Sequence, residues 1–183
     1  STPLYSSAAS DVYKRQIRQY ILNYGSLLGI VSIIFSLMLF FLDMHYQNSP
    51  FQQVVSFIIL SASIIVAFIA FKKDNEGFIN LSECFKLGLG ISLLGGLIGF
   101  LYFIILINFL DPEVLEKGFK YQSEIMRMNN PELSQEMIES AIEMQRNFST
   151  PGIIFVFVMI FQLFIGFIIS LIGGLIVKKS RPE

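Results

Sequence analysis

The sequence predicts an all-α, polytopic membrane protein with four transmembrane helices and an extracytoplasmic helical hairpin between the third and fourth. Three observations favour this fold class. The 183-residue chain is 54% hydrophobic, has a mean hydropathy of +0.64, and carries charges on only 15% of its residues. Four apolar runs each reach the length of about 20 residues that a helix needs to cross a bilayer. The longest polar segment lies between the third and fourth runs.

The four apolar runs contain no charged side chain and are predicted to be the spans. A membrane β-barrel is disfavoured, because its strands alternate polar and apolar residues over about ten positions. Leu, Ile and Phe at a helix centre each favour insertion by about 0.3 to 0.6 kcal/mol. Residues 17–183 are therefore expected to form a single four-helix membrane domain. Its spans are expected at residues 21–42, 54–71, 87–110 and 153–177.

The first sixteen residues, Ser1–Gln16, are interpreted as a sequencing-adapter artefact that is not native protein. Residues 6–16 can be back-translated, with permitted codons, into a sequence that resembles a transposon-based sequencing adapter. A genuine polar tail is the alternative. On the adapter interpretation the native N-terminus is missing, and Lys14 and Arg15 must not inform the topology.

Basic residues in the connecting segments predict that both termini are cytoplasmic. The first loop, residues 43–53, contains no Lys or Arg, so the positive-inside tendency places it outside. The third loop holds four basic residues among eight acidic ones, and the tendency weakens in so long a loop. Basic residues gather at the predicted cytoplasmic side: Arg18, Lys72, Lys73, Lys86, Lys178, Lys179 and Arg181.

Residues 111–152 are expected to form the outer helical hairpin. Asp111 before Pro112 and Asn130 before Pro131 each combine an N-cap residue with a proline suited to a first helical turn. The expected apolar faces, packed on each other or on the membrane surface, are Val114, Gly118, Tyr121, Ile125 and Met128 in the first helix, and Leu133, Met137, Ala141, Met144 and Phe148 in the second. The expected acidic exterior consists of Glu116, Glu124, Glu132, Glu136, Glu139 and Glu143.

Small residues recur at helical spacing in the spans and predict close helix packing. The segment GLGISLLGGLI at residues 88–98 is nearly repeated as GFIISLIGGLI at residues 166–176. On antiparallel helices both copies would lie at the same depth, which predicts that the third and fourth spans pack together. The candidate packing residues are Gly88, Ser92, Gly95, Gly96, Gly99, Gly166, Ser170, Gly173 and Gly174.

No catalytic, metal-binding or cofactor-binding constellation emerges from the sequence. The one histidine, His45, and the one cysteine, Cys84, fall on opposite sides of the predicted membrane, so His45 is expected to be solvated and Cys84 to be a small apolar contact. Gln162 is expected to hydrogen-bond between helices. Residues 74–77 are interpreted as a turn into a capping box formed by Asn80 and Glu83, rather than a cation loop.

The arrangement of spans and three motifs together resemble a known family. These motifs are KKDNEGFINLSECFKLG from Lys72, DPEVLEK from Asp111, and FSTPG from Phe148. With four spans they resemble the uncharacterised bacterial membrane family called domain of unknown function 4199, found mainly in Bacteroidota. The resemblance covers essentially everything after Gln16. It implies a multi-pass protein of the bacterial cytoplasmic (inner) membrane and brings no activity, substrate or cofactor.

Three functions remain open on the sequence. The first is a structural or regulatory, non-enzymatic protein that binds a protein partner, or forms a homo-oligomer, through the small-residue faces or the outer hairpin. The second is a small-solute transporter or channel subunit, which a polar cavity around Gln162 would favour. The third is a membrane enzyme that uses hairpin carboxylates. Contact with the lipid bilayer is expected in each case, and nucleic acid is not, because no basic stripe exists.

Overall fold

The computed structural model describes residues 3–180, with side chains from Lys14 onward. It confirms the all-α fold class, with four long apolar helices and a shorter helical pair between the third and fourth. The interpretation of Ser1–Gln16 as an adapter falls largely outside the described side chains and stays a prediction. The elements are α1 (Pro3–Phe41), α2 (Pro50–Asp74), α3 (Leu81–Ile105), a π-helical turn (Leu106–Leu110), α4 (Val114–Asn129), α5 (Gln135–Asn147) and α6 (Pro151–Val177).

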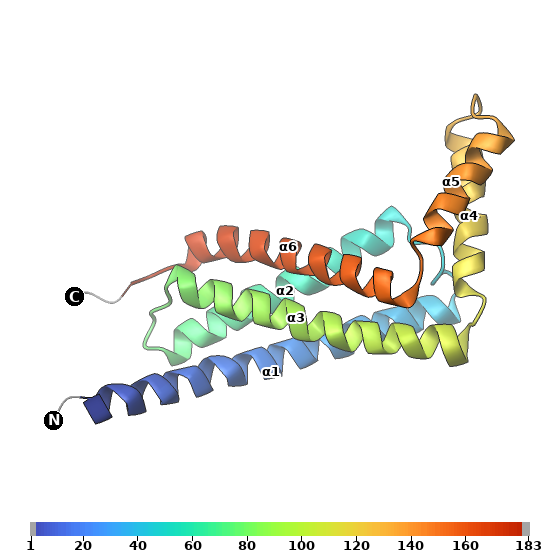
Figure 1. The fold of residues 1–183 in the computed structure, drawn as a ribbon. Coiled ribbons are helices and arrows are strands. Elements are labelled where there is room, and N and C mark those ends of the chain that lie inside the picture. The colour runs from blue at the N-terminus through green and yellow to red at the C-terminus, as the bar shows by residue number, and fades with distance from the viewer. Residues whose placement is uncertain (1–2, 181–183) are drawn as a thin grey trace.

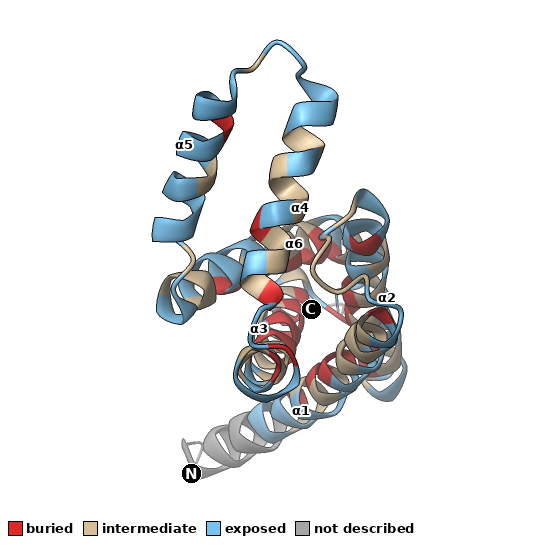
Figure 2. Cartoon of the chain, turned by 90° about the vertical axis from the view of Figure 1, so that its right-hand side faces the viewer, coloured by how far each residue is buried: buried red, intermediate tan, exposed pale blue. Residues whose placement is uncertain are grey.

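The four long helices form a bundle in which α3 is central (Figure 1). Helix α3 makes its most extensive contacts with α1 and α6, and α2 packs against all three. The start of α1 and the end of α6 lie at one end of the bundle, here called the terminal end. The α4–α5 pair stands across the opposite end, here called the hairpin end, and extends sideways beyond the bundle (Figures 1 and 2).

The most deeply buried side chains lie in the half of the bundle nearer the terminal end. In this half Phe68 and Phe71 of α2 pack with Leu87 and Ile91 of α3, and all four are fully buried. Elsewhere the spans expose large apolar side chains, such as Phe161 on α6, which is 67% exposed. Because lipid is as apolar as these side chains, they are suited to face a bilayer.

A capping box fixes the start of α3, as the sequence predicts. The Asn80 side chain accepts a hydrogen bond from the Glu83 backbone N–H at 2.9 Å, and the Glu83 carboxylate accepts from the Asn80 N–H at 2.6 Å. The preceding turn places Glu76 and Gly77 at positive φ angles of 57° and 84°. These residues reverse the chain between α2 and α3.

We expect Asn80→Ala to destabilise the protein by about 1 kcal/mol, because the first turn of α3 loses the acceptor for one of its free N–H groups. The measurement is thermal unfolding in detergent. Asn80→Asp is the matched control, since aspartate retains the capping oxygen. Equal destabilisation by both substitutions would contradict the capping role.

The third span ends in a π-helical turn rather than in the uninterrupted α-helix that the sequence suggests. The backbone N–H of Asp111 donates to the carbonyl of Leu106 at 2.8 Å, a bond that spans five residues. Proline at position 112 disfavours the α conformation for the residue before it, so the helix must end at Leu110. After this wider last turn Asp111 lies at the hairpin end, and its side chain is buried.

Both helices of the hairpin begin a few residues later than expected. Helix α4 begins at Val114, although the Asp111 carboxylate still accepts from the Glu113 N–H at 3.2 Å while it also binds Lys117, as described below. Helix α5 begins after Ser134, whose hydroxyl accepts from the Met137 N–H at 3.3 Å, rather than after Asn130.

The expected apolar faces of the two hairpin helices do not pack on each other, and their packing on a membrane surface stays a prediction. The first helix turns its expected apolar face to the α1–α2 loop, where Tyr121 packs edge-on against Tyr46 with ring centroids 6.1 Å apart. Helix α5 therefore meets a different, partly charged face of α4, around Phe119, and inserts Ile138 there. The expected acidic exterior is confirmed, since all six of its glutamates are exposed, and four of them line the open groove between the two helices: Glu116, Glu136, Glu139 and Glu143.

Candidate functional site at the hairpin end

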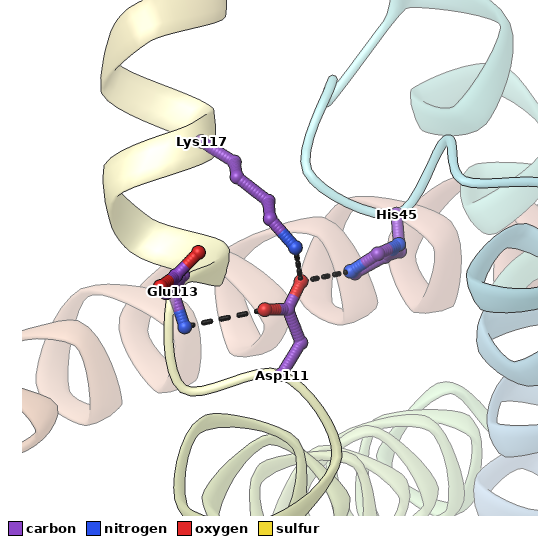
Figure 3. Close-up of polar contacts among 4 residues, drawn as sticks. All are labelled: His45, Asp111, Glu113 and Lys117. Atoms are coloured by element: carbon purple, nitrogen blue, oxygen red, sulfur yellow. Dashed lines mark hydrogen bonds and ion pairs between the residues drawn. The ribbon is translucent and has the colours of Figure 1, made fainter.

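The Asp111 carboxylate joins three parts of the chain at the hairpin end (Figure 3). Its Oδ2 atom accepts hydrogen bonds from His45 Nε2 and from Lys117 Nζ, both at 2.8 Å. Its Oδ1 atom accepts from the backbone N–H of Glu113 at 3.2 Å. The carboxylate thereby ties the α1–α2 loop and the first turn of α4 to the end of α3.

The electrostatics of this cluster favour the ionised carboxylate. Burial by itself raises the pKa of Asp111, but the hydrogen bonds from Lys117 and His45 outweigh it, and the pKa lies below its ordinary value. The hydrogen bond to Asp111 raises the pKa of Lys117 in turn, against a smaller effect of burial that lowers it. The pair is therefore an aspartate anion with a lysine cation at neutral pH.

The expectation that His45 is solvated is wrong. Its side chain is only 6% exposed and lies between two aromatic rings, tilted against Phe40 at 5.0 Å and edge-on to Tyr46 at 5.5 Å between ring centroids. Since an ionised carboxylate can only accept, His45 Nε2 must carry the hydrogen in the bond to Asp111. The other ring nitrogen, Nδ1, is buried and has no hydrogen-bond partner in the described part of the chain.

A cavity of about 170 Å³ lies beside the histidine, between the hairpin-end parts of α1 and α3. The polar side chains on its wall are Ser36, His45 and Tyr102. The hydroxyl of Tyr102 is buried, and within residues 14–180 it meets no hydrogen-bond partner. His45 and Tyr102, each with one buried polar atom that has no partner among the described residues, thus both contribute to the wall of this cavity. A concave space with a few polar residues on an otherwise apolar wall is a candidate binding site.

The candidate packing residues of α3 and α6 lie against each other in two reciprocal contacts. An ideal Cβ added to Gly88 would lie 1.8 Å from Ser170 Oγ, and one added to Gly166 would lie 2.1 Å from Ser92 Oγ. Gly88 of α3 thus packs against Ser170 of α6, and Gly166 of α6 packs against Ser92 of α3. Both serines are fully buried.

The other candidate glycines have different neighbours. A Cβ on Gly96 or on Gly174 would meet the facing helix of this pair, at 2.2 Å from Met159 Cε and 2.9 Å from Leu81 Cδ1. Gly95 instead faces Leu28 of α1 at 2.4 Å, and Gly173 faces Phe68 of α2 at 3.4 Å. Gly99 lies on the cavity wall, and a Cβ there would meet no atom of another element within 4 Å.

Comparison with protein families gives one match. The model described as "Protein of unknown function (DUF4199)" matches residues 23–179, which covers α1 from Asn23 onward, the other three long helices and the hairpin. The chain belongs to the DUF4199 family. No curated protein and no solved structure matches it.

The matched region of this DUF4199 protein contains the Asp111 cluster, the cavity beside His45 and the interlocked α3–α6 pair. The family description carries no activity. Among the described residues, no group of three or more His, Cys, Asp or Glu side chains has an arrangement that could hold a metal ion. The function of the DUF4199 chain must therefore be argued from its surfaces and from the cavity.

The hairpin of the DUF4199 chain also presents an exposed apolar face on α5. Met137, Met144 and Phe148 are 58%, 65% and 57% exposed. Met137 and Met144 lie on α5, and Phe148 follows its last residue. They remain exposed because α5 turns a different face, that of Ile138, toward α4. This set of three residues is called the α5 apolar face below.

Proposed function

We propose that this DUF4199 protein is a non-enzymatic structural or regulatory protein of the bacterial cytoplasmic membrane, and that it binds a membrane protein partner through the α4–α5 hairpin. The α5 apolar face is the observation that carries this proposal. Three large apolar side chains on a helix outside the long apolar helices have nothing to cover them within the described chain. Methionine-rich surfaces suit partner binding, because the flexible side chain adapts to its contact.

The charge of the hairpin defines the chemistry of the partner. Residues 111–152 contain eight acidic and four basic side chains, a net charge of −4. An anionic lipid surface would repel this segment, whereas a basic protein surface would attract it. Because the hairpin extends sideways beyond α6 (Figure 1), it lies where a neighbouring membrane protein would present its own outer segment. The proposed partner is therefore a membrane protein with a basic segment beside an apolar groove.

Two contacts support partner binding over the alternative functions. Gln162 Nε2 donates to the backbone carbonyl of Ser92 at 3.0 Å, so this side chain joins α6 to α3. A role in transport would instead require Gln162 to line a polar cavity. Among the groove carboxylates, Glu116 forms an ion pair with Arg146, which also lies over the Phe119 ring at 5.0 Å. A carboxylate engaged by a guanidinium is a poor general base.

The proposed orientation places the terminal end in the cytoplasm. The α2–α3 link, the start of α1 and the end of α6 share that end of the bundle (Figure 1), which agrees with an even number of spans. The basic residues of the link and the tail support its cytoplasmic location through the positive-inside tendency. The hairpin and the α1–α2 loop are then extracytoplasmic.

The experiment places a photo-crosslinking amino acid at Met144 of the full chain in native membranes. Gln145, also exposed but on a different face of α5, is the matched control position. We expect one membrane protein to be crosslinked at Met144 through a basic segment, and not at Gln145. The purified partner should then bind the reconstituted protein, and Met137→Asp should weaken binding at least tenfold. Adducts with lipid alone, adducts with a second copy of the chain, or binding that survives Met137→Asp would overturn the proposal.

A further inference from the structure

We propose that a cluster of four lysines at the terminal end binds an anionic phospholipid that carries two phosphate groups. This set, called the lysine cluster below, consists of Lys72 and Lys73 in the last turn of α2 and of Lys178 and Lys179 directly after α6. The proposal is independent of the hairpin partner, because it rests on the opposite end of the bundle (Figure 1). It is argued from the contacts that join the two lysine pairs, from the local charges and from the apolar surface beside the cluster.

Two contacts bring the lysine pairs together, although they are far apart in the sequence. Lys72 Nζ donates to the backbone carbonyl of Val177, 105 positions later, at 2.7 Å. The backbones of Ile79 and Lys179 then exchange hydrogen bonds of 3.0 and 2.8 Å, which form an antiparallel bridge between the α2–α3 link and the tail. Lys179 Nζ also lies 5.4 Å from the centroid of the Phe78 ring. The two pairs therefore share one surface, where the end of α2, the link and the tail meet.

The lysine cluster forms no ion pair with a carboxylate of the described residues. The ion pairs of this part of the chain all lie at the hairpin end. Two carboxylates of the α2–α3 link already accept hydrogen bonds from other groups, Asp74 from the Tyr20 hydroxyl and Glu83 from the Asn80 N–H. Since a lysine ammonium group can only donate, the cluster presents cationic donors that suit an external anion such as a phosphate.

The depth of the cluster favours a lipid phosphate over a soluble one. The lysines end two apolar helices that are long enough to cross a bilayer, so the phosphates of one leaflet would lie beside them. Basic sites between membrane helices are typical binding places for anionic lipid headgroups. Helices α2 and α6 are in contact, and each exposes large apolar side chains within three turns of its lysines, which suit the acyl chains of a lipid. These side chains are Val66 and Ile69 on α2, and Ile172 and Ile176 on α6.

The arrangement in two pairs favours a lipid with two phosphates. One phosphate would bind the pair at the end of α2, and the other would bind the pair after α6. In a lipid that links both phosphates through a short bridge, binding of the first holds the second at a high effective concentration near its site. Two separate lipids with one phosphate each lack this advantage. Cardiolipin is a membrane lipid with the required headgroup.

The test removes one charge from each pair. Lys73 and Lys178 are exposed, and within the described residues neither side chain forms a hydrogen bond or an ion pair. Lys73→Gln combined with Lys178→Gln should therefore leave the fold intact. Lys120→Gln combined with Arg127→Gln is the matched control, because it removes the same charge from two exposed positions on α4. Lys73→Arg combined with Lys178→Arg is a second control that retains the charge.

The experiment uses the full chain in a neutral detergent, with bound lipids counted by native mass spectrometry. Cardiolipin is compared with phosphatidylglycerol at the same total phosphate concentration, and with phosphatidylcholine, which has no net charge. Inorganic pyrophosphate, a soluble diphosphate, is added as a competitor to distinguish a lipid from a soluble ligand. The thermal unfolding midpoint of each variant checks that it is folded.

We expect the unmodified chain to bind one cardiolipin saturably, and at least tenfold more tightly than phosphatidylglycerol. A lysine near an anionic lipid surface contributes about fivefold in affinity, so the double glutamine variant should weaken cardiolipin binding about tenfold or more. The α4 control and the double arginine variant should bind as the unmodified chain does. Equal affinity for cardiolipin and phosphatidylglycerol, full displacement by an equal concentration of pyrophosphate, equal losses in the glutamine variant and the α4 control, or loss of binding in the arginine variant would overturn the proposal.

Discussion

Gly88→Leu is expected to force α3 away from α6 and to destabilise the bundle by about 3 kcal/mol, the upper end of the usual cost of overpacking. The first added carbon would already lie 1.8 Å from Ser170 Oγ and 3.1 Å from Ser170 Cβ. The serine cannot simply turn away, because it is fully buried and donates to the Gly166 carbonyl at 2.6 Å. Since contact between membrane helices depends on close approach of their backbones, the whole contact should loosen.

The measurement is the thermal unfolding midpoint of the full chain in detergent, with Gly99→Leu as control. The control adds the same side chain to the same helix at a position where the Cβ meets open space. A compensating pair sharpens the test: Gly88→Ala should destabilise, and Ser170→Gly added to it should recover part of the loss, because it removes the oxygen that the new carbon meets. Equal effects of leucine at positions 88 and 99 would contradict the reciprocal glycine–serine contact.

The sequence was sufficient to predict the fold class, because that depends on the length and apolarity of four runs and on the polar segment between the last two. Charge-free runs of 18 residues or more leave a chain few alternatives to helices that cross a bilayer. The capping box at Asn80 was equally predictable, since both partners are three residues apart and the bonds are local. Features of this kind require no knowledge of the tertiary arrangement.

The hairpin shows where local pattern fails. Helical periodicity correctly gave α4 an apolar face, but could not say that Tyr46, from a loop 75 residues earlier, would occupy it. Once that face is taken, α5 must pack elsewhere on α4, and its own apolar residues remain exposed. A periodic pattern identifies which face of a helix is apolar, but it does not identify the element that packs on that face.

The Asp111 cluster was missed for the same reason. Asp111 before Pro112 has the local pattern of a helix cap, and His45 follows an apolar run where solvated residues are common. Their contact joins residues 66 positions apart, a separation that one sequence does not encode in any spacing. The available signal was chemical: a sole histidine and an aspartate each end an apolar run on the same predicted side of the membrane.

Asp111→Ala is expected to destabilise the protein by about 2–4 kcal/mol, because it leaves the buried His45 ring and the Glu113 N–H without their acceptor. The hairpin should also lose its fixed attachment, which faster hydrogen exchange in α4 would report. Lys117→Met is the matched control. It removes an exposed partner and should cost much less. A similar loss in both variants, or unchanged exchange in Asp111→Ala, would contradict a central role for the carboxylate.

Acidification should reveal the same contribution in the unmodified protein. Because the folded-state pKa of Asp111 lies below its value in the unfolded chain, the carboxylate stabilises the fold fully above the unfolded value of about 3.9 and loses this effect as the pH falls through the folded pKa. Asp111→Asn keeps an oxygen that accepts hydrogen bonds but cannot titrate. The difference in stability between wild type and Asp111→Asn should therefore be constant above about pH 5 and shrink below about pH 4. Other carboxylates titrate in both proteins and cancel in the difference, so a difference that stays constant down to pH 2 would exclude an ionised Asp111 as the stabilising form.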